Sequence, residues 1–104
     1  MDSEILGEII ATRLLSLTDE GESQRPVSVF VGKPQPTRDS PGYDCPFQLI
    51  GLGSQETQLA HGRDSIHALQ AALILIGAQL NRLNHEVGGR LRWDGAGQGD
   101  LGFP

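Results

Sequence analysis

The chain has 104 residues, of which 38% are hydrophobic and 20% are charged, and its formal net charge is −5. This length fits one domain with a modest core, and the composition excludes a largely disordered chain. The negative net charge disfavours general binding to nucleic acid, because phosphate groups would be repelled and the 8 Lys and Arg residues form no run.

The N-terminus and the cysteine content favour a cytoplasmic protein. Residues 1–4 are acidic, whereas a signal peptide would begin with basic residues. The longest apolar stretch, residues 71–78, is far shorter than the ~20 residues that a membrane span needs. Cys45 is the only cysteine, so no intrachain disulfide can form, which favours a reducing compartment. We therefore expect no contact with a membrane.

The N-terminal third of the chain predicts a β-hairpin. Residues 1–8 are expected to be an extension of the domain, and the Ile-, Leu- and Thr-rich run over 9–18 predicts the first strand. A polar turn follows over 19–23, and residues 26–31 then alternate between apolar and polar, which predicts the second strand. Arg13 is the polar exception on the apolar face of the first strand.

The middle of the chain predicts a loop and a second hairpin. Residues 32–42 contain three prolines and are expected to form a loop. Strands are predicted over 43–51 and 56–61, with the hairpin centred near Gly53. The second hairpin therefore completes a meander of about four strands.

A long helix is predicted over 64–83, ending before Gly88. Asp64 is the expected N-cap, because its carboxylate can accept hydrogen bonds from backbone N–H groups two or three residues later. A final short strand is predicted over 90–93. Apolar residues at helical spacing are expected to face the sheet: Ile66, Leu69, Leu73, Ile76, Leu80 and Leu83.

The order β-β-β-β-α-β predicts an α+β fold, in which an antiparallel β-meander of about four strands carries one long helix packed on the sheet and one short final strand. We expect a single domain over 9–94 and a Gly-rich C-terminal tail over 95–104. The tail contains G-x-G-x-x-G at 97–102, but no helix follows it, so neither a dinucleotide site nor another cofactor is predicted.

The side of the helix that points away from the sheet is also predicted to be apolar. A helix that is apolar nearly all round is normally buried all round, and one sheet cannot cover both sides. We therefore expect an interface with a second copy of the chain or with another bacterial protein. The alternative is that residues 1–8 or 32–42 cover this side. The residues concerned are Ala68, Ala71, Ile74, Leu75 and Ala78.

Four residues are candidates for chemistry. The predicted hairpin makes Cys45 and His61 neighbours, and a thiol beside an imidazole can become a nucleophilic thiolate. A structural cysteine with a hydrogen-bonded histidine is the alternative. His61, Asp64 and His67 are all possible metal ligands, but their spacing matches no established metal motif and Asp64 is explained as an N-cap. No metal is therefore predicted.

Several short motifs recur in an order that resembles a known family. They read IATR, RPV, CPF, AHGRD, ALQ and GDLGFP, and they cover residues 10–104. Together they resemble a family of small bacterial proteins known only as a domain of unknown function. The resemblance implies a bacterial source and implies that the tail ending in Gly-Phe-Pro belongs to the domain. It implies no activity.

The sequence thus favours a non-catalytic module that binds a protein or self-associates, because no convincing catalytic set is present. The alternative is a small-ligand-binding domain or an enzyme whose site lies near Cys45, His61 and His67. A nucleic-acid binder that uses the scattered arginines is a third and weaker hypothesis.

Overall fold

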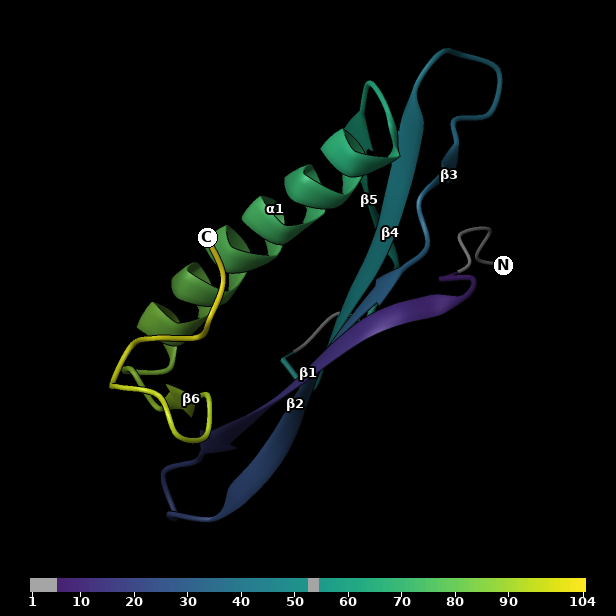
Figure 1. The fold of residues 1–104 in the computed structure, drawn as a ribbon. Helices are drawn as coiled ribbons and strands as arrows, with labels where there is room; N and C mark the ends of the chain where they lie inside the picture. Colours follow the sequence, from purple (N-terminus) through teal and green to yellow (C-terminus); the bar gives the residue numbers. More distant parts are fainter. Residues whose placement is uncertain (1–5, 53–54) are drawn as a thin grey trace.

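The computed structural model describes residues 6–52 and 55–104, so most of the predicted extension 1–8 and the predicted hairpin centre at Gly53 lie outside the described residues. All strand pairs are antiparallel, and α1 covers one face of the sheet (Figure 1). The predicted α+β fold is therefore confirmed. The elements are β1 (Ile9–Thr18), β2 (Gln24–Gly32), β3 (Gln35–Pro36), β4 (Tyr43–Ile50), β5 (Gln58–Gly62), α1 (Ser65–Glu86) and β6 (Leu91–Arg92).

β5 lies at one edge of the sheet, and β1 lies with β6 at the opposite edge. β4 pairs with β5 over residues 43–47, with β3 over 43–44 and with β2 over 47–50. A strand has two hydrogen-bonding edges, so β3 and β2 must share the edge of β4 that faces away from β5. β1 pairs with β2 on one side and with β6 on the other. The short strand β3 was not predicted, since it lies in the segment that was expected to be a loop.

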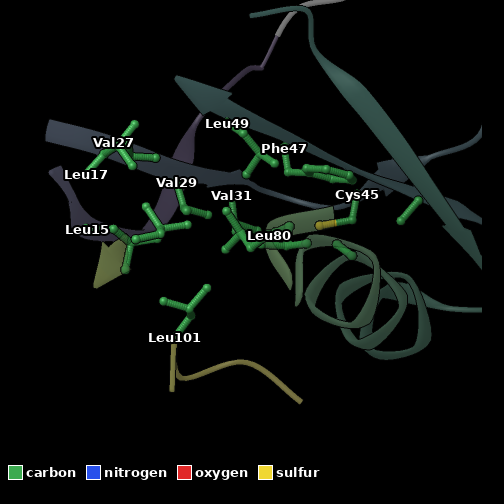
Figure 2. Close-up of a cluster of buried hydrophobic side chains, with 14 of the residues drawn as sticks. Leu15, Leu17, Val27, Val29, Val31, Cys45, Phe47, Leu49, Leu80 and Leu101 are labelled. Carbon is green, nitrogen blue, oxygen red and sulfur yellow. The ribbon is translucent and has the colours of Figure 1, made fainter. Parts of the chain in front are cut away.

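The core lies between the inner face of the sheet and α1. Alternate residues of β2 are buried, because successive side chains of a strand point to opposite faces. Phe47 and Cys45 of β4 point toward the helix, and Leu101 approaches the core from the C-terminal end of the chain (Figure 2). Burying this apolar surface is the main stabilising contribution to the fold.

The pairing of β4 with β5 differs by one residue from the predicted hairpin. Cys45 pairs with Ala60, whereas the sequence predicted that it would face His61. A shift of one residue moves every side chain of a strand to the other face of the sheet. His61 therefore shares the outer face with Asp44, and Ala60 lies in the core. The small side chain suits this position because α1 packs directly against β5.

The buried face of α1 includes Ile76 and Leu80 as predicted, and Leu69, Leu73 and Leu83 pack against the core, but the start of the helix differs from the prediction. Ile66 is 67% exposed, whereas Ala68, expected to point away from the sheet, is fully buried. A Cβ on Gly62 would collide with the backbone of Ala68, so the start of α1 approaches β5 too closely for large side chains. The buried residues of α1 are Ala68, Ala72, Ile76, Gly77, Leu80 and Asn84.

The last part of the chain packs on the domain. Leu101 is 5% exposed and belongs to the core, and Phe103 packs against that core. The segment runs back from β6 along α1, where a Cβ on Gly77 would lie 3.0 Å from the Cβ of Phe103 (Figure 1). We call residues 93–104 the C-terminal segment. Nowhere in residues 6–52 or 55–104 does the chain form a helix long and apolar enough to cross a membrane.

Candidate functional site

Cys45 lies in the core and has no histidine beside it. The residue is fully buried on β4, and its Sγ lies 3.5 Å from the carbonyl oxygen of Gly32, to which it can donate a weak hydrogen bond. Burial raises the pKa of the Cys45 thiol, because the thiolate would lose its hydration. The thiol is therefore protonated and inaccessible, which is the opposite of what a nucleophilic cysteine needs.

His61 lies in a polar cluster on the outer face of the sheet. Its Nδ1 is 3.0 Å from Oδ1 of Asp44 and 3.2 Å from Oγ1 of Thr37. Asp44 is the cross-strand partner of His61, so the pairing of β4 with β5 places the two side chains together. The sequence did not single out Thr37 or Asp44. Asp44 comes one residue before Cys45, and its contact with His61 can be predicted only when the register of β4 and β5 is known.

The arrangement of this cluster differs from that of a catalytic triad. In a hydrolase triad the nucleophile and the carboxylate contact different nitrogens of the imidazole ring, whereas Thr37 and Asp44 both contact Nδ1 of His61. The side chain of His61 is 57% exposed. The cluster joins Thr37, which follows β3, to β4 and β5 on the outer face of the sheet.

Asp64 and His67 both act at the start of α1. Oδ1 of Asp64 accepts a hydrogen bond from the backbone N–H of His67 at 2.8 Å, which confirms the predicted N-cap. Nδ1 of His67 accepts a hydrogen bond from the N–H of Arg63 at 2.9 Å. His61 has separate partners, so the three candidates do not converge. In the part of the chain that the structure describes, no group of three or more His, Cys, Asp or Glu side chains could hold a metal ion.

The residues singled out on the outer side of α1 differ in exposure. Ile74 is 57% exposed, Leu75 is 41% exposed and Ala78 is also exposed, whereas Ala71 is half-buried against the core. Neither the loop after β2 nor the described part of the N-terminus covers Ile74 and Leu75. These side chains therefore present apolar surface on the helix.

One flank of α1 follows strand β5. The amides of Gln79 and Gln58 exchange two hydrogen bonds, at 3.0 and 2.8 Å, which fixes this flank against β5. Residues four apart lie on the same side of a helix, so Leu75 and Ala71 continue the row that Gln79 begins. The other flank, through Gly77, carries the C-terminal segment. We call Ala71, Ile74, Leu75 and Ala78 the outer residues of α1.

Strand β5 has an unpaired edge beside this row. Among the described strands, β5 pairs with β4 alone. Its sequence, Gln-Leu-Ala-His-Gly, contains no Lys, Asp, Glu or Pro, and Leu59 is 43% exposed. Proteins commonly use charged residues or proline to prevent an edge strand from pairing with another chain. The unpaired edge of β5 has none of these, and the outer residues of α1 extend the same surface.

At the opposite edge of the sheet, residues near the C-terminus pack on the Arg13 side chain of β1. The guanidinium of Arg13 lies 3.9 Å from the centroid of the Trp93 ring and 4.7 Å from that of Phe103. Its Nη1 donates hydrogen bonds to the carbonyl oxygens of Leu101, at 3.2 Å, and Gly102, at 2.8 Å. Arg13, which the sequence marked as an exception on an apolar face, is thus the residue that holds the C-terminal segment. A cation among apolar residues needs aromatic or carbonyl partners, and this signal in the sequence could have identified Arg13.

The comparisons with known proteins give the family. A search of curated proteins and a search of solved structures each found no match. A family model described as a domain of unknown function, DUF6968, matches residues 11–104. The match includes the C-terminal segment that Arg13 holds. Because it covers nearly the whole chain, the protein belongs to the DUF6968 family.

Proposed function

We propose that the protein is a non-catalytic module that self-associates as a symmetric homodimer through β5 and the adjoining outer residues of α1. The observation that carries the proposal is the unpaired edge of β5 beside the exposed side chain of Leu75. The sequence-based expectation of an interface at Ala71, Ile74, Leu75 and Ala78 supports the same surface. A second copy of the chain is the occupant that this surface fits.

The edge of β5 is suited to pairing with its own copy. Two antiparallel β5 strands related by a two-fold axis would satisfy each other's outward backbone N–H and C=O groups and would continue the sheet. The strand carries no formal charge when His61 is neutral, so the two copies do not repel each other strongly. Self-pairing of this kind needs no second type of protein.

The helices would contribute side-chain contacts to the same dimer. Pairing of the two β5 strands brings the α1 flank with Ala71 and Leu75 close to its copy, because this flank follows β5. Ala71 is small and allows the two helices to approach closely. Removing the exposed part of Leu75 from water would stabilise the dimer by roughly 1 kcal/mol per copy.

The test is the mass of the protein in solution. We expect wild-type protein to have a dimer mass by size-exclusion chromatography with light scattering. Leu75→Glu should have a monomer mass at the same concentration, because a carboxylate would be buried in the interface. The dimer dissociation constant should rise at least about tenfold, which corresponds to about 1.4 kcal/mol.

Ile66→Glu is the matched control. Ile66 is more exposed than Leu75, and the two residues lie nine positions apart, which is two and a half helical turns, so they are on opposite sides of α1. Ile66→Glu should keep the dimer mass. A monomeric wild-type protein, or a dimer that Leu75→Glu leaves unchanged while both variants remain folded by circular dichroism, would contradict the proposal.

A further inference from the structure

Arg13 is a positive charge whose hydrogen-bonding capacity is only partly used. Both of its hydrogen bonds are donated by Nη1, and both acceptors are backbone carbonyl oxygens. In residues 6–52 and 55–104, Nε and Nη2 of Arg13 have no hydrogen-bond partner and no carboxylate forms an ion pair with the guanidinium. A guanidinium can bind a carboxylate with two parallel hydrogen bonds, and one such edge of Arg13 is available.

A small apolar cavity adjoins this guanidinium. It has a volume of about 100 Å³ and lies between β1, β2, α1 and the C-terminal segment. For comparison, an apolar cavity of about 150 Å³ can hold benzene, so this smaller one suits an aliphatic chain of roughly four or five carbons. The residues that line it are Ala11, Thr12, Arg13, Val29, Val31, Leu73 and Phe103.

We infer that this cavity is a binding site for a small aliphatic carboxylate. The carboxylate would accept hydrogen bonds from Nε and Nη2 of Arg13, and the aliphatic chain would contact Val29, Val31 and Leu73. The apolar lining supplies affinity for the chain, and the single cation selects a carboxylate over a neutral group of the same length. The site is separate from the proposed dimer interface, since Leu73 lies on the flank of α1 opposite Leu75.

Binding at this site should also stabilise the C-terminal segment. Phe103 forms one wall of the cavity and packs on the same guanidinium that would bind the carboxylate. A ligand that contacts both therefore favours the docked position of the segment, because any group that binds only the folded state stabilises it. The expected affinity is in the millimolar range, because so few ligand atoms are involved.

The test is a titration of wild-type protein followed by two-dimensional NMR. Butyrate and hexanoate should shift the Arg13 Nε–H signal and the methyl signals of Val31 and Leu73 in a saturable way. Hexan-1-ol, which has the same chain but no charge, should bind at least about tenfold more weakly. Absence of saturable shifts with hexanoate up to about 20 mM, or equal affinity for the alcohol, would overturn the inference.

Two variants of β1 separate the cavity from the rest of the surface. Ala11→Phe adds a large side chain to the cavity wall at a residue that is already exposed, and it should weaken hexanoate binding at least about tenfold. Leu14→Phe enlarges a side chain that is 66% exposed and does not line the cavity, so binding should be unchanged. A folded Ala11→Phe protein that binds hexanoate as tightly as wild type would also overturn the inference.

Discussion

The two edges of the sheet are finished in different ways. At one edge, β6 pairs with residues 16–17 of β1, and the guanidinium of Arg13 holds the C-terminal segment beside the same strand. At the other edge, β5 pairs with β4 and with no other described strand. The first edge is covered in part by this chain, since residues 9–15 of β1 pair with β2 alone among the described strands, whereas the second has no described strand beyond β5.

The difference indicates which edge of the sheet a second copy of the chain could pair with. Covering the β1 edge uses contacts between residues about 90 positions apart, such as the hydrogen bond from Arg13 to the carbonyl of Gly102. A Cβ on Gly102 would collide with the Trp93 ring, so that contact also depends on one glycine with φ of +82°. No described strand covers the free edge of β5 in this way. Substitutions at the β1 edge should therefore change the stability of one chain, and substitutions beside β5 should change association.

Arg13→Ala is expected to have the largest effect on stability. It removes two charge-assisted hydrogen bonds and the contacts with two aromatic rings, and it leaves the carbonyl oxygens of Leu101 and Gly102 without this donor. The free energy of unfolding should fall by about 3 kcal/mol in urea denaturation. Amide hydrogen exchange in the C-terminal segment should become faster by a larger factor than in β5.

Arg92→Ala is the control for that experiment. Arg92 lies on β6 at the same edge, is exposed, and has no ion pair within the described part of the chain. Its loss should change the free energy of unfolding by no more than about 0.5 kcal/mol. If Arg13→Ala were as mild as Arg92→Ala, the coverage of the β1 edge would not depend on the guanidinium, and the contrast between the two edges would be lost.

The strands and the helix could be predicted from the sequence because their signals are local. Alternation placed Val27, Val29 and Val31 in the core, and the carboxylate of Asp64 marked the start of α1. The short strand β3 carries no such signal, because its two residues lie in a proline-rich segment and pair with β4 through tertiary structure alone. Local sequence patterns were therefore enough to predict the fold class.

The candidate sites could not be predicted in the same way, because they depend on register and on distant contacts. One residue of error in the hairpin was enough to place Cys45 beside His61, when β4 pairs Cys45 with Ala60. The burial of Ala68 at the start of α1 depends on the close approach to Gly62, which only the assembled structure reveals. The partners of Arg13 are almost a full chain length away, so no local pattern points to them.

The pH dependence of stability tests whether water reaches Cys45 in the core beneath the unpaired edge of β5. Burial raises the pKa of Cys45, so the folded chain keeps the thiol proton at a pH where the unfolded chain loses it near about 8.5. Stability from this group is complete below that pH and decreases as the pH rises. The decrease should reach at most about 1.4 kcal/mol at a pH of about 9.5.

Cys45→Ala isolates this contribution. The difference in unfolding free energy between wild type and Cys45→Ala should shrink as the pH is raised from about 7 to about 9.5, and iodoacetamide should alkylate the folded wild-type protein only at the rate of unfolding. A difference that stays constant with pH, together with fast alkylation of the folded chain, would mean that water reaches the core beside β5.

His61→Ala should have the smallest effect, and it compares directly with Arg13→Ala because each removes a side chain that joins separate elements near one edge. The imidazole of His61 is 57% exposed, and its interaction with Asp44 is screened by water. We expect a loss of about 0.5 kcal/mol in urea denaturation. The measurement belongs in the Leu75→Glu background, where self-association does not contribute. A loss close to that of Arg13→Ala would mean that β5 is held by its polar cluster, and the β5 edge would then be as specialised as the β1 edge.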